Sequence, residues 1–283
     1  MFEKDIIISI IIPCYNHGIY IDEAIKSVEE YKFDNYEIII INDGSTDDYT
    51  NKRLIELKSE GYNVIFQENK GLGRTRNNGI RLAKGKYILP LDADNKIKPD
   101  YILKAINILD SEPSISIVYS DRKLFGNSDE SFIVGEFSIE KIVNCNYIDA
   151  CAIFRKSLWE QVGGYDDKMP VQGWEDWDFW LMAIENESKF YYIPEPLFYY
   201  RVLDHSMIQQ LMNSPNYNLL LRYVYIKHAF IMKEKFIDEM FKLQNEINYL
   251  NQEIVRLNQT KAYRLGKFIL KPFLNIRKQF VKI

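Results

Sequence analysis

The chain has 283 residues, of which 47% are hydrophobic and 14% aromatic, enough for a large core and too apolar for a disordered protein. The formal net charge is −4, yet the last segment, from Lys261 to Ile283, has seven Lys or Arg and no acid. The remainder is therefore more acidic than the whole, which excludes general nucleic-acid binding.

The cysteines and the first residues indicate a cytoplasmic location. Cys14, Cys145 and Cys151 form no Cys-x-x-Cys pair, and reduced thiols of a cytosolic protein are the simplest account. The start, MFEKD, lacks the basic flank and apolar core of a signal peptide. The apolar run Ile6–Ile12 is too short for a bilayer, which takes roughly 20 residues. We expect a cytoplasmic protein, either soluble or at the inner face of the cell membrane.

The first part of the chain alternates between apolar β-branched runs and amphipathic stretches of about ten residues. This alternation predicts βαβ units, a mostly parallel sheet and right-handed crossovers. The expected strands are Ile6–Ile12, Glu37–Ile41, Val64–Phe66, Tyr87–Leu91 and Ile115–Tyr119, and the expected helices are Tyr20–Glu30, Tyr49–Ser59, Gly71–Ala83 and Pro99–Leu109.

The alternation ends after Tyr119. Residues Asp121–Glu136 are polar and predict a loop. Strands are expected at Asp149–Phe154 and Phe190–Tyr200, with a helix at Asp176–Glu187 between them. The predicted fold class is therefore α/β, with a Rossmann-like, mostly parallel sheet and a mixed C-terminal extension, over residues 1–207.

A helical segment is expected at residues 208–260, and its last part has a coiled-coil pattern. Apolar residues recur there at spacings of three and four for nearly three heptads. The pattern favours self-association into a homo-oligomer, and the alternative is a helix packed on the body of the same chain. The seam consists of Met240, Leu243, Ile247, Leu250, Ile254 and Leu257.

The basic tail, residues 261–283, interleaves its cations with aromatic and aliphatic residues. Pro272 is expected to divide it into two short helices, neither long enough to span a bilayer. Each half could lie on an anionic membrane surface with its apolar face buried. The alternative is a basic helix that packs against the acidic body.

Two carboxylates follow the strand Tyr87–Leu91. Asp92 and Asp94 flank the small Ala93, and residues two apart in extended chain point to the same side. Both can face a cleft at the carboxyl end of the sheet, where open α/β sheets bind ligands. Two desolvated acids repel each other, and a divalent cation would relieve that cost. The alternative is a capping pair or a solvated turn.

Polar residues also follow the second and third predicted strands. Asp43 precedes Gly44 at a strand end, where a carboxylate can accept a hydrogen bond from a planar base, or can simply cap a helix. The stretch Gly71–Arg76 fails as a dinucleotide fingerprint, because its sixth position is Arg. Arg74, Arg76 and Asn77 instead stand at a helix start that suits a diphosphate.

A cluster of acids and aromatics occupies residues 174–178, with the sequence Trp-Glu-Asp-Trp-Asp. Aromatic surroundings raise the pKa of a carboxylate and suit a general base, although Asp178 is equally a capping acid. His205 follows the last predicted strand. It could ligate a metal ion or be structural.

Four motifs stand in one order along the chain, and together they resemble the inverting glycosyltransferases of family 2, which have the GT-A fold. The resemblance extends from about Ile8 to Met207. It is based on Pro13-x-Tyr15-Asn16, on Asn42-Asp43-Gly44-Ser45-x-Asp47, on Asp92-Ala93-Asp94 and on Glu175-Asp176.

The resemblance implies a metal-dependent transfer of a sugar from a nucleotide-sugar, expected to be a UDP-sugar, to a hydroxyl of a glycan or lipid-linked glycan in surface polysaccharide synthesis. Asp94, with His205 near the place of a second ligand, would hold Mn²⁺ or Mg²⁺ on the diphosphate. Asp176 would be the general base, with Glu175 beside it. The nucleotide-sugar would contact Pro13, Tyr15, Asn16, Asp43, Arg74, Asn77, Asp92 and Ala93.

The chain departs from the family pattern at Asn42 and Asn95, where many relatives have acids. The second departure leaves Asp94 as the main metal ligand. Two other functions stay open. A non-catalytic scaffold would use the coiled coil, and a sugar-phosphate nucleotidyltransferase has a similar sheet but opens with a Gly-rich phosphate loop that Ile10–Asn16 lacks. The sequence does not identify the sugar or the acceptor.

Overall fold

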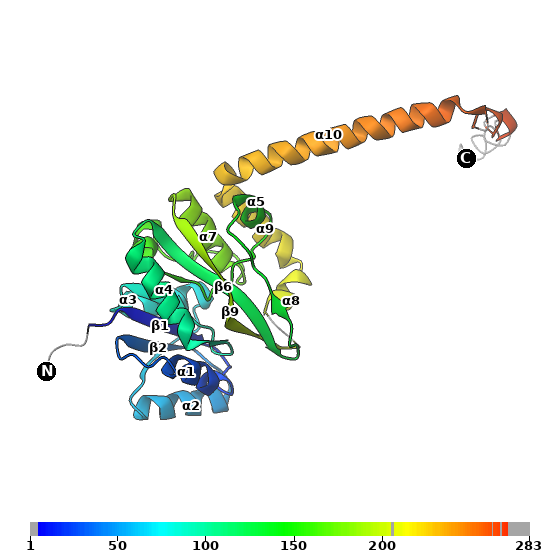
Figure 1. Cartoon of the computed structure of the whole chain (residues 1–283). Helices are drawn as coiled ribbons and strands as arrows, with labels where there is room; N and C mark the ends of the chain where they lie inside the picture. The colour runs from blue at the N-terminus through cyan, green and yellow to red at the C-terminus, as the bar shows by residue number, and fades with distance from the viewer. Residues whose placement is uncertain (1–4, 205–206, 262, 267, 271–283) are drawn as a thin grey trace. The chain divides into compact units, whose positions relative to one another are not determined.

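The computed structural model describes residues 5–204, 207–261, 263–266 and 268–270 (Figure 1). The chain divides into two compact units, Met1–Ile231 and Met232–Ile283. The first contains the sheet and its helices, together with α8 (Met207–Met212) and α9 (Asn216–Lys227). The second contains most of helix α10 (Ala229–Gln259).

The amino-terminal half of the sheet is parallel, as predicted. Its strands stand in the order β3–β2–β1–β4, and every neighbouring pair in this part runs parallel. Three helices connect these strands, which confirms the expected βαβ units. The elements are β1 (Ile8–Cys14), α1 (Ile21–Glu29), β2 (Tyr36–Asp43), α2 (Asp48–Ser59), β3 (Asn63–Gln67), α3 (Leu72–Leu82) and β4 (Tyr87–Pro90).

The carboxyl-terminal half is mixed, again as predicted. Beyond β4 the order continues β8–β6–β9–β5, with β7 paired to β6, and only β6 and β9 run parallel there. The elements are β5 (Lys96–Ile97), α4 (Pro99–Ser111), β6 (Ile115–Gly126), β7 (Ser131–Phe132), α5 (Ile139–Asn144), β8 (Ile153–Arg155), α6 (Lys156–Val162), α7 (Glu175–Glu185) and β9 (Lys189–Val202).

The loop predicted at Asp121–Glu136 is wrong in two places, because β6 continues to Gly126 beside β9 and β7 occupies Ser131–Phe132. Contacts with distant residues offset its polar character. The ring of Phe125 packs edge-on against that of Tyr199, with centroids 6.4 Å apart. Asp121 accepts hydrogen bonds from the hydroxyl of Tyr192 (2.6 Å) and from the backbone N–H of Val134 (2.7 Å).

Helices cover both faces of the parallel strands, which explains why the strand sequences are continuously apolar (Figure 1). Alternate residues of β1, such as Ile10 and Ile12, belong to a core cluster with residues of α1 and α4. Ile11 points to the opposite face, toward α3. A Cβ on Gly79 of α3 would lie 2.5 Å from Cγ2 of Ile11, so α3 approaches the sheet as closely as a helix can.

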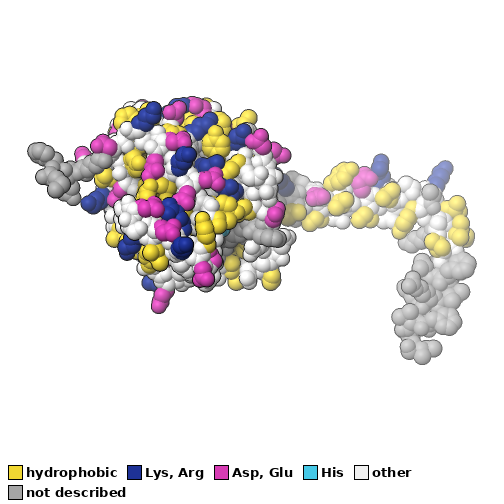
Figure 2. All heavy atoms as spheres, turned by 90° about the horizontal axis from the view of Figure 1, so that it is seen from below, with side chains coloured by type: hydrophobic (Ala, Val, Ile, Leu, Met, Phe, Trp, Pro, Cys, Tyr) yellow, Lys and Arg dark blue, Asp and Glu magenta, His cyan; other side chains and the backbone are white. Residues whose placement is uncertain are grey.

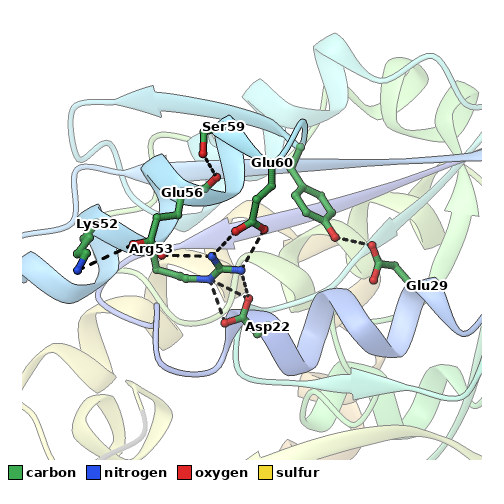
Figure 3. A network of polar contacts seen from close by, with 8 residues as sticks. Asp22, Glu29, Lys52, Arg53, Glu56, Ser59 and Glu60 are labelled. Atoms are coloured by element: carbon green, nitrogen blue, oxygen red, sulfur yellow. Dashed lines mark hydrogen bonds and ion pairs between the residues drawn. The ribbon is translucent and has the colours of Figure 1, made fainter.

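Helices α1 and α2 are joined by Arg53 (Figure 3). Its guanidinium binds Asp22 of α1 at 2.8 Å and Glu60, just after α2, at 2.8 Å. The hydroxyl of Tyr62 donates to Glu29 of α1 at 2.5 Å. These contacts fix the helices next to the loops that follow β1 and β2.

Helix α10 has hydrophobic side chains on its surface, as Figure 2 shows. The predicted seam is exposed along its length, with exposed fractions from 50% for Ile247 to 71% for Met240.

In the described part of the chain, no helix is long and apolar enough to cross a membrane. Cys14, Cys145 and Cys151 are free thiols in the structure.

The close approach of α3 leads to a prediction for Gly79→Ala. The added methyl would overlap Ile11 and Ile41, and overpacking of this kind costs about 1–3 kcal/mol, partly offset by the better helix propensity of Ala. We expect a lower free energy of unfolding in urea. Gly266→Ala is the control, because nothing lies within 4 Å of its Cβ position. Equal stability of both variants would contradict the packing.

Candidate active site

The loops after β1 and β2 are bound together by Asn16. This residue has a φ of 57°, a left-handed conformation that Asn tolerates. Its side-chain oxygen accepts hydrogen bonds from the backbone N–H groups of Thr46 (2.7 Å) and Asp47 (3.2 Å). Pro13 is buried in β1, whereas Tyr15 is 45% exposed beside Asn16. The first two strand ends therefore form one rigid rim with an exposed aromatic ring.

Asp43 ends β2 and is nearly buried. Its carboxylate accepts hydrogen bonds from the side chain of Gln67 (2.7 Å) and from the backbone N–H groups of Lys70 (2.9 Å) and Gly71 (3.0 Å). A carboxylate has about four acceptor positions. Asp43 therefore orders the approach to α3 and keeps limited capacity for a ligand.

The segment Asp92–Ala93–Asp94 lies just beyond β4, separated from it by Leu91. Ala93 packs into the core cluster, while the side chains of Asp92 and Asp94 keep 33% and 16% of their surface exposed. Burial, and next the charge of Asp92, raise the pKa of Asp94. The side chain of the following Asn95 accepts a hydrogen bond from the backbone N–H of Arg201 (2.9 Å) and so joins this segment to β9.

Arg76 of α3 is the buried cation of this site, with 2% of its surface exposed. Its Nη2 lies 2.8 Å from Oδ1 of Asp92. Burial alone would lower the pKa of Arg76, but the nearby charges, first that of Asp92 and then those of Asp176 and Glu175, raise it. The Nε atom of Arg76 is buried and has no hydrogen-bond partner. One guanidinium therefore neutralises acids from two separate segments.

Glu175 and Asp176 begin helix α7. Glu175 is buried, and its Oε2 accepts a hydrogen bond from the backbone N–H of Gly173 (2.9 Å). Asp176 accepts a hydrogen bond from the side-chain amide of Asn146 (2.8 Å). Burial raises the pKa of Asp176 to about 6 and also raises that of Glu175, although the charge of Arg76 lowers both. A pKa of about 6 lies in the range that suits a carboxylate for general-base catalysis near neutral pH.

A further acid, Asp149, belongs to the same group and escaped the sequence analysis. Burial, together with the charges of Asp92 and Asp176, raises its pKa to about 7. Its Oδ1 accepts a hydrogen bond from the backbone N–H of Cys151 (3.0 Å). Its place just before a short apolar strand was the available signal. The pKa depends on distant acids that a sequence does not show.

Arg74 and Asn77, the two residues of α3 predicted to contact the nucleotide-sugar, point elsewhere than Arg76. Arg74 is half-exposed and pairs with Asp167 at 3.2 Å. Asn77 is buried, donates to the carbonyl of Tyr165 (2.8 Å) and accepts from the indole N–H of Trp159 (2.9 Å). The residue of α3 that contacts Asp92 is therefore Arg76. Neither Arg74 nor Asn77 does so.

Asp178, two residues after Asp176, has a structural environment. It is fully buried, with Nζ of Lys227 at 2.8 Å and Nε2 of His228 at 2.9 Å. Lys227 also contacts Asp166 at 2.6 Å. This ion cluster fixes the start of α7 against the end of α9 and so positions the neighbouring Asp176.

Of the two predicted metal ligands, Asp94 and His205, the structure describes only Asp94. His205 lies outside the described residues. Asp94 faces His17, whose Nδ1 lies 3.8 Å from Oδ2 of Asp94. The described segments contain no group of three or more His, Cys, Asp or Glu arranged to hold a metal ion. Mg²⁺ and similar ions are commonly held by one or two carboxylates and the phosphates of a substrate, so Asp94 at a strand end fits a cation that arrives with a diphosphate.

Comparison with known families decides the class of the protein. A profile described as glycosyl transferase family 2 matches residues 9–163, which is more than half of the chain. The chain belongs to this family. It is therefore an enzyme, a glycosyltransferase, and its matched region contains the first three of the four motifs.

Several relatives have similar sequences to this glycosyltransferase. The putative glycosyltransferase EpsH of Bacillus subtilis is 27% identical over 273 residues, covering 90% of this chain and 78% of EpsH. The chondroitin synthase of Pasteurella multocida is 26% identical over 272 residues, covering 92% of this chain but only 26% of the synthase. Likewise, the match covers 22% of an uncharacterized Sinorhizobium fredii protein, y4gI.

Solved structures confirm a GT-A-like fold for this glycosyltransferase. S. aureus TarS, residues 1–349, in complex with UDP-GlcNAc superposes with a TM-score of 0.65 at 18% identity, covering 80% of this chain and 69% of TarS. The mannosyltransferase PcManGT of Pyrobaculum calidifontis, in complex with GDP-Man and Mn²⁺, gives a TM-score of 0.54 at 15% identity, covering 92% and 83%.

The raised pKa of Asp149 predicts a pH-dependent gain of stability in Asp149→Asn. In the fold this acid stays protonated up to a pH of about 7, far above the range of an unfolded Asp. Its contribution to stability is complete below about pH 4 and is lost as the pH rises through 7. Without divalent ions, the variant should melt several degrees above the wild type at pH 8 and equally at pH 4.

The matched control for this measurement is Asp100→Asn, an exposed acid in the first turn of α4. It should show no gain that depends on pH. If Asp149→Asn melts like the wild type at pH 8, the desolvation of Asp149 is refuted.

Proposed function

We propose that this glycosyltransferase is inverting and metal-dependent, and that it transfers a sugar from a nucleotide-sugar to a hydroxyl of a glycan or lipid-linked glycan. The observation that carries the proposal is the arrangement of two acidic ends around Arg76. Asp92 and Asp94 lie at the end of β4, and Glu175 and Asp176 at the start of α7. The acids that follow β4 suit a diphosphate with its cation, and the acids that begin α7 suit removal of a proton from the acceptor.

The donor is proposed to be a UDP-sugar that lies across the strand ends. Tyr15, with Pro13 and Asn16, would border the base, and Asp43 would accept from it with its remaining acceptor capacity. Asp92 and Ala93 would lie at the ribose. Complexes of TarS with UDP and UDP-GlcNAc support a uridine nucleotide, while the GDP-Man complex of PcManGT shows that this fold also accommodates another base.

The diphosphate is proposed to lie between Asp94 and the start of α3, with Arg74 and Asn77 near it and Arg76 on the side of Asp92. A divalent cation, Mn²⁺ or Mg²⁺, held by Asp94 together with a histidine ligand, for which His205 is the candidate from the sequence, would offset the charge of the departing diphosphate. The buried Nε of Arg76 supplies a donor that has no partner in the protein. Its positive charge favours the leaving group as charge develops there.

Chemistry in the proposed reaction is a single displacement. Asp176 takes the proton from the acceptor hydroxyl, and that oxygen forms a bond to the anomeric carbon. The bond from this carbon to the diphosphate oxygen breaks on the opposite face, so the configuration inverts and no covalent enzyme intermediate is needed. The hydrogen bond from Asn146 orients Asp176, and Glu175 lies beside it on the acceptor side.

The acceptor is proposed to be a glycan or lipid-linked glycan of a surface polysaccharide. Two relatives support this class by name, the chondroitin synthases of Pasteurella multocida and of Escherichia coli. The segment from Asp121 to Glu136, which contains the end of β6 and β7, and the aromatic residues near Trp174 are proposed to select it.

Self-association through α10 is proposed from the seam and its flanks. In heptad terms, Met240, Ile247 and Ile254 occupy the a positions of the seam, and Leu243, Leu250 and Leu257 occupy the d positions. Each a position is preceded by a glutamate, namely Glu239, Glu246 and Glu253. Each d position is followed by an amide residue, namely Gln244, Asn251 and Asn258. In an antiparallel pair the glutamates would face one another, whereas a parallel pair places them opposite the amides. Ile at a and Leu at d also favours a parallel dimer.

The catalytic proposal predicts that Asp176→Asn lowers transfer by roughly 10²-fold or more, since the amide cannot accept the proton. Affinity for the nucleotide-sugar should change little. In the wild type, kcat/KM should rise with pH up to about 6, because Asp176 must be ionised to act. The measurement is nucleotide release from a panel of nucleotide-sugars, with and without Mn²⁺ and candidate acceptors.

Asp100→Asn again serves as the control, because it removes a carboxylate from the same helical position away from the site. Normal turnover of Asp176→Asn would move the base elsewhere. If the wild type binds nucleotide-sugars but turns over none of them, the chain is a binding scaffold. Nucleotide transfer to a sugar phosphate would instead indicate a nucleotidyltransferase.

The basic tail is proposed to bind anionic membrane surfaces, and a parallel pair would present two tails together. Most of it lies outside the described residues, but Phe268 is 78% exposed beside Leu265 and Ile269. A chain ending at Gln259 should lose binding to anionic vesicles and remain a dimer. One ending at Ile231 should be monomeric, and both should keep hydrolysis of the nucleotide-sugar.

Vesicle co-sedimentation at low and physiological salt, together with light scattering, measures both properties. Vesicle binding that is unchanged after removal of the tail would show that the tail packs on the protein. A monomeric full-length chain would rule out the coiled coil.

A further inference from the structure

His17 belongs to the tight turn that follows β1, and its ring is fixed in place. Its carbonyl accepts a hydrogen bond from the backbone N–H of Tyr20 (3.0 Å). The rings of His17 and Tyr20 meet edge to face, with centroids 5.8 Å apart at 83°. The His17 side chain is 41% exposed, so it remains accessible to a ligand.

The same contacts connect His17 to the metal-binding end of the site. The guanidinium of Arg201 lies 4.4 Å from the centroid of the Tyr20 ring. Its Nε donates a hydrogen bond to the backbone carbonyl of Asp94 at 2.8 Å. Arg201 thus positions the aromatic support of His17 and the backbone of Asp94 at once, which gives the two side chains a fixed separation.

That separation fits two ligands of one ion. Nδ1 of His17 lies 3.8 Å from Oδ2 of Asp94, which is too long for a direct hydrogen bond. Two ligands at about 2.1 Å from a shared cation are about 3.0 Å apart at a right angle and about 4.2 Å apart when opposite. The observed distance lies between these limits.

We propose that His17, rather than His205, is the histidine ligand of the divalent cation beside Asp94, and that it makes the site prefer Mn²⁺ to Mg²⁺. The inference rests on the proposed metal dependence. An imidazole binds Mn²⁺ more strongly than Mg²⁺, which selects oxygen ligands and water. Two protein ligands are too few for a tight site in the free enzyme, so the diphosphate completes the coordination.

The test uses the full-length protein with MnCl₂ and uridine diphosphate. In the ternary complex, electron spin-echo spectra of bound Mn²⁺ should show coupling to a nitrogen of imidazole. His17→Ala should lose this coupling and bind Mn²⁺ at least tenfold more weakly, while its affinity for Mg²⁺ changes less than about threefold. Without the nucleotide, binding of Mn²⁺ should be weak in every variant.

Three comparisons separate the possible outcomes. Asp94→Asn should lose both ions, and His205→Ala should keep the nitrogen coupling, so a coupling lost only in His205→Ala would assign the ligand to His205 and overturn the proposal. Wild-type Mn²⁺ binding in both His17→Ala and His17→Gln would overturn it too, leaving the transferase function intact. No Mn²⁺ binding by the wild type with the nucleotide would reject the metal site itself. Unchanged melting temperatures confirm that the variants fold.

Discussion

The ion pair between Arg76 and Asp92 holds the two halves of the active site together. A buried guanidinium is costly unless acids surround it, and Arg76 has Asp92 at 2.8 Å with Asp176 and Glu175 close enough to influence its pKa. The acids need the cation equally, because like charges at this depth would otherwise hold one another protonated. Loss of Arg76 would therefore disturb the acids that follow β4 and the acids that begin α7 together.

The position of Arg76 depends on how α3 packs. Gly79 lets the helix touch β1 and β2, and Asn77 fastens it to the loop at Tyr165 through buried hydrogen bonds. The hydroxyl of Thr75 donates to the carbonyl of Gly71 at the helix start. Thr75 and Asn77, the neighbours of Arg76, are buried and hydrogen-bonded. The side chain of Arg76 therefore points toward the end of β4, where it contacts Asp92. The packing of α3 on the sheet thus determines where the guanidinium of Arg76 lies relative to the acids.

The sequence predicted the parallel strands and the position of acids at the strand ends, because continuous β-branched runs and the acids that follow them are local signals. It missed the extension of β6 because that strand is stabilised by Tyr192 and Tyr199, which are distant in sequence. The choice among Arg74, Arg76 and Asn77 depends on the rotation of a helix, which no single motif encodes. Gly79 offered a clue, since a residue three positions before it lies on the same, sheet-facing side.

The two ends of the site use the same physical effect for different purposes. Burial raises the pKa of Asp94 and of Asp176, so both carboxylates are poorly compensated in the free protein. A cation beside Asp94 would supply positive charge next to Asp92 and, through Asp92, reduce the repulsion that Asp149 experiences. The remaining acids, including Asp176, would then ionise at lower pH. In the proposed reaction the cation arrives with the diphosphate, so donor binding would favour the ionised form of Asp176 and would couple proton removal to the presence of the sugar that the acceptor oxygen attacks.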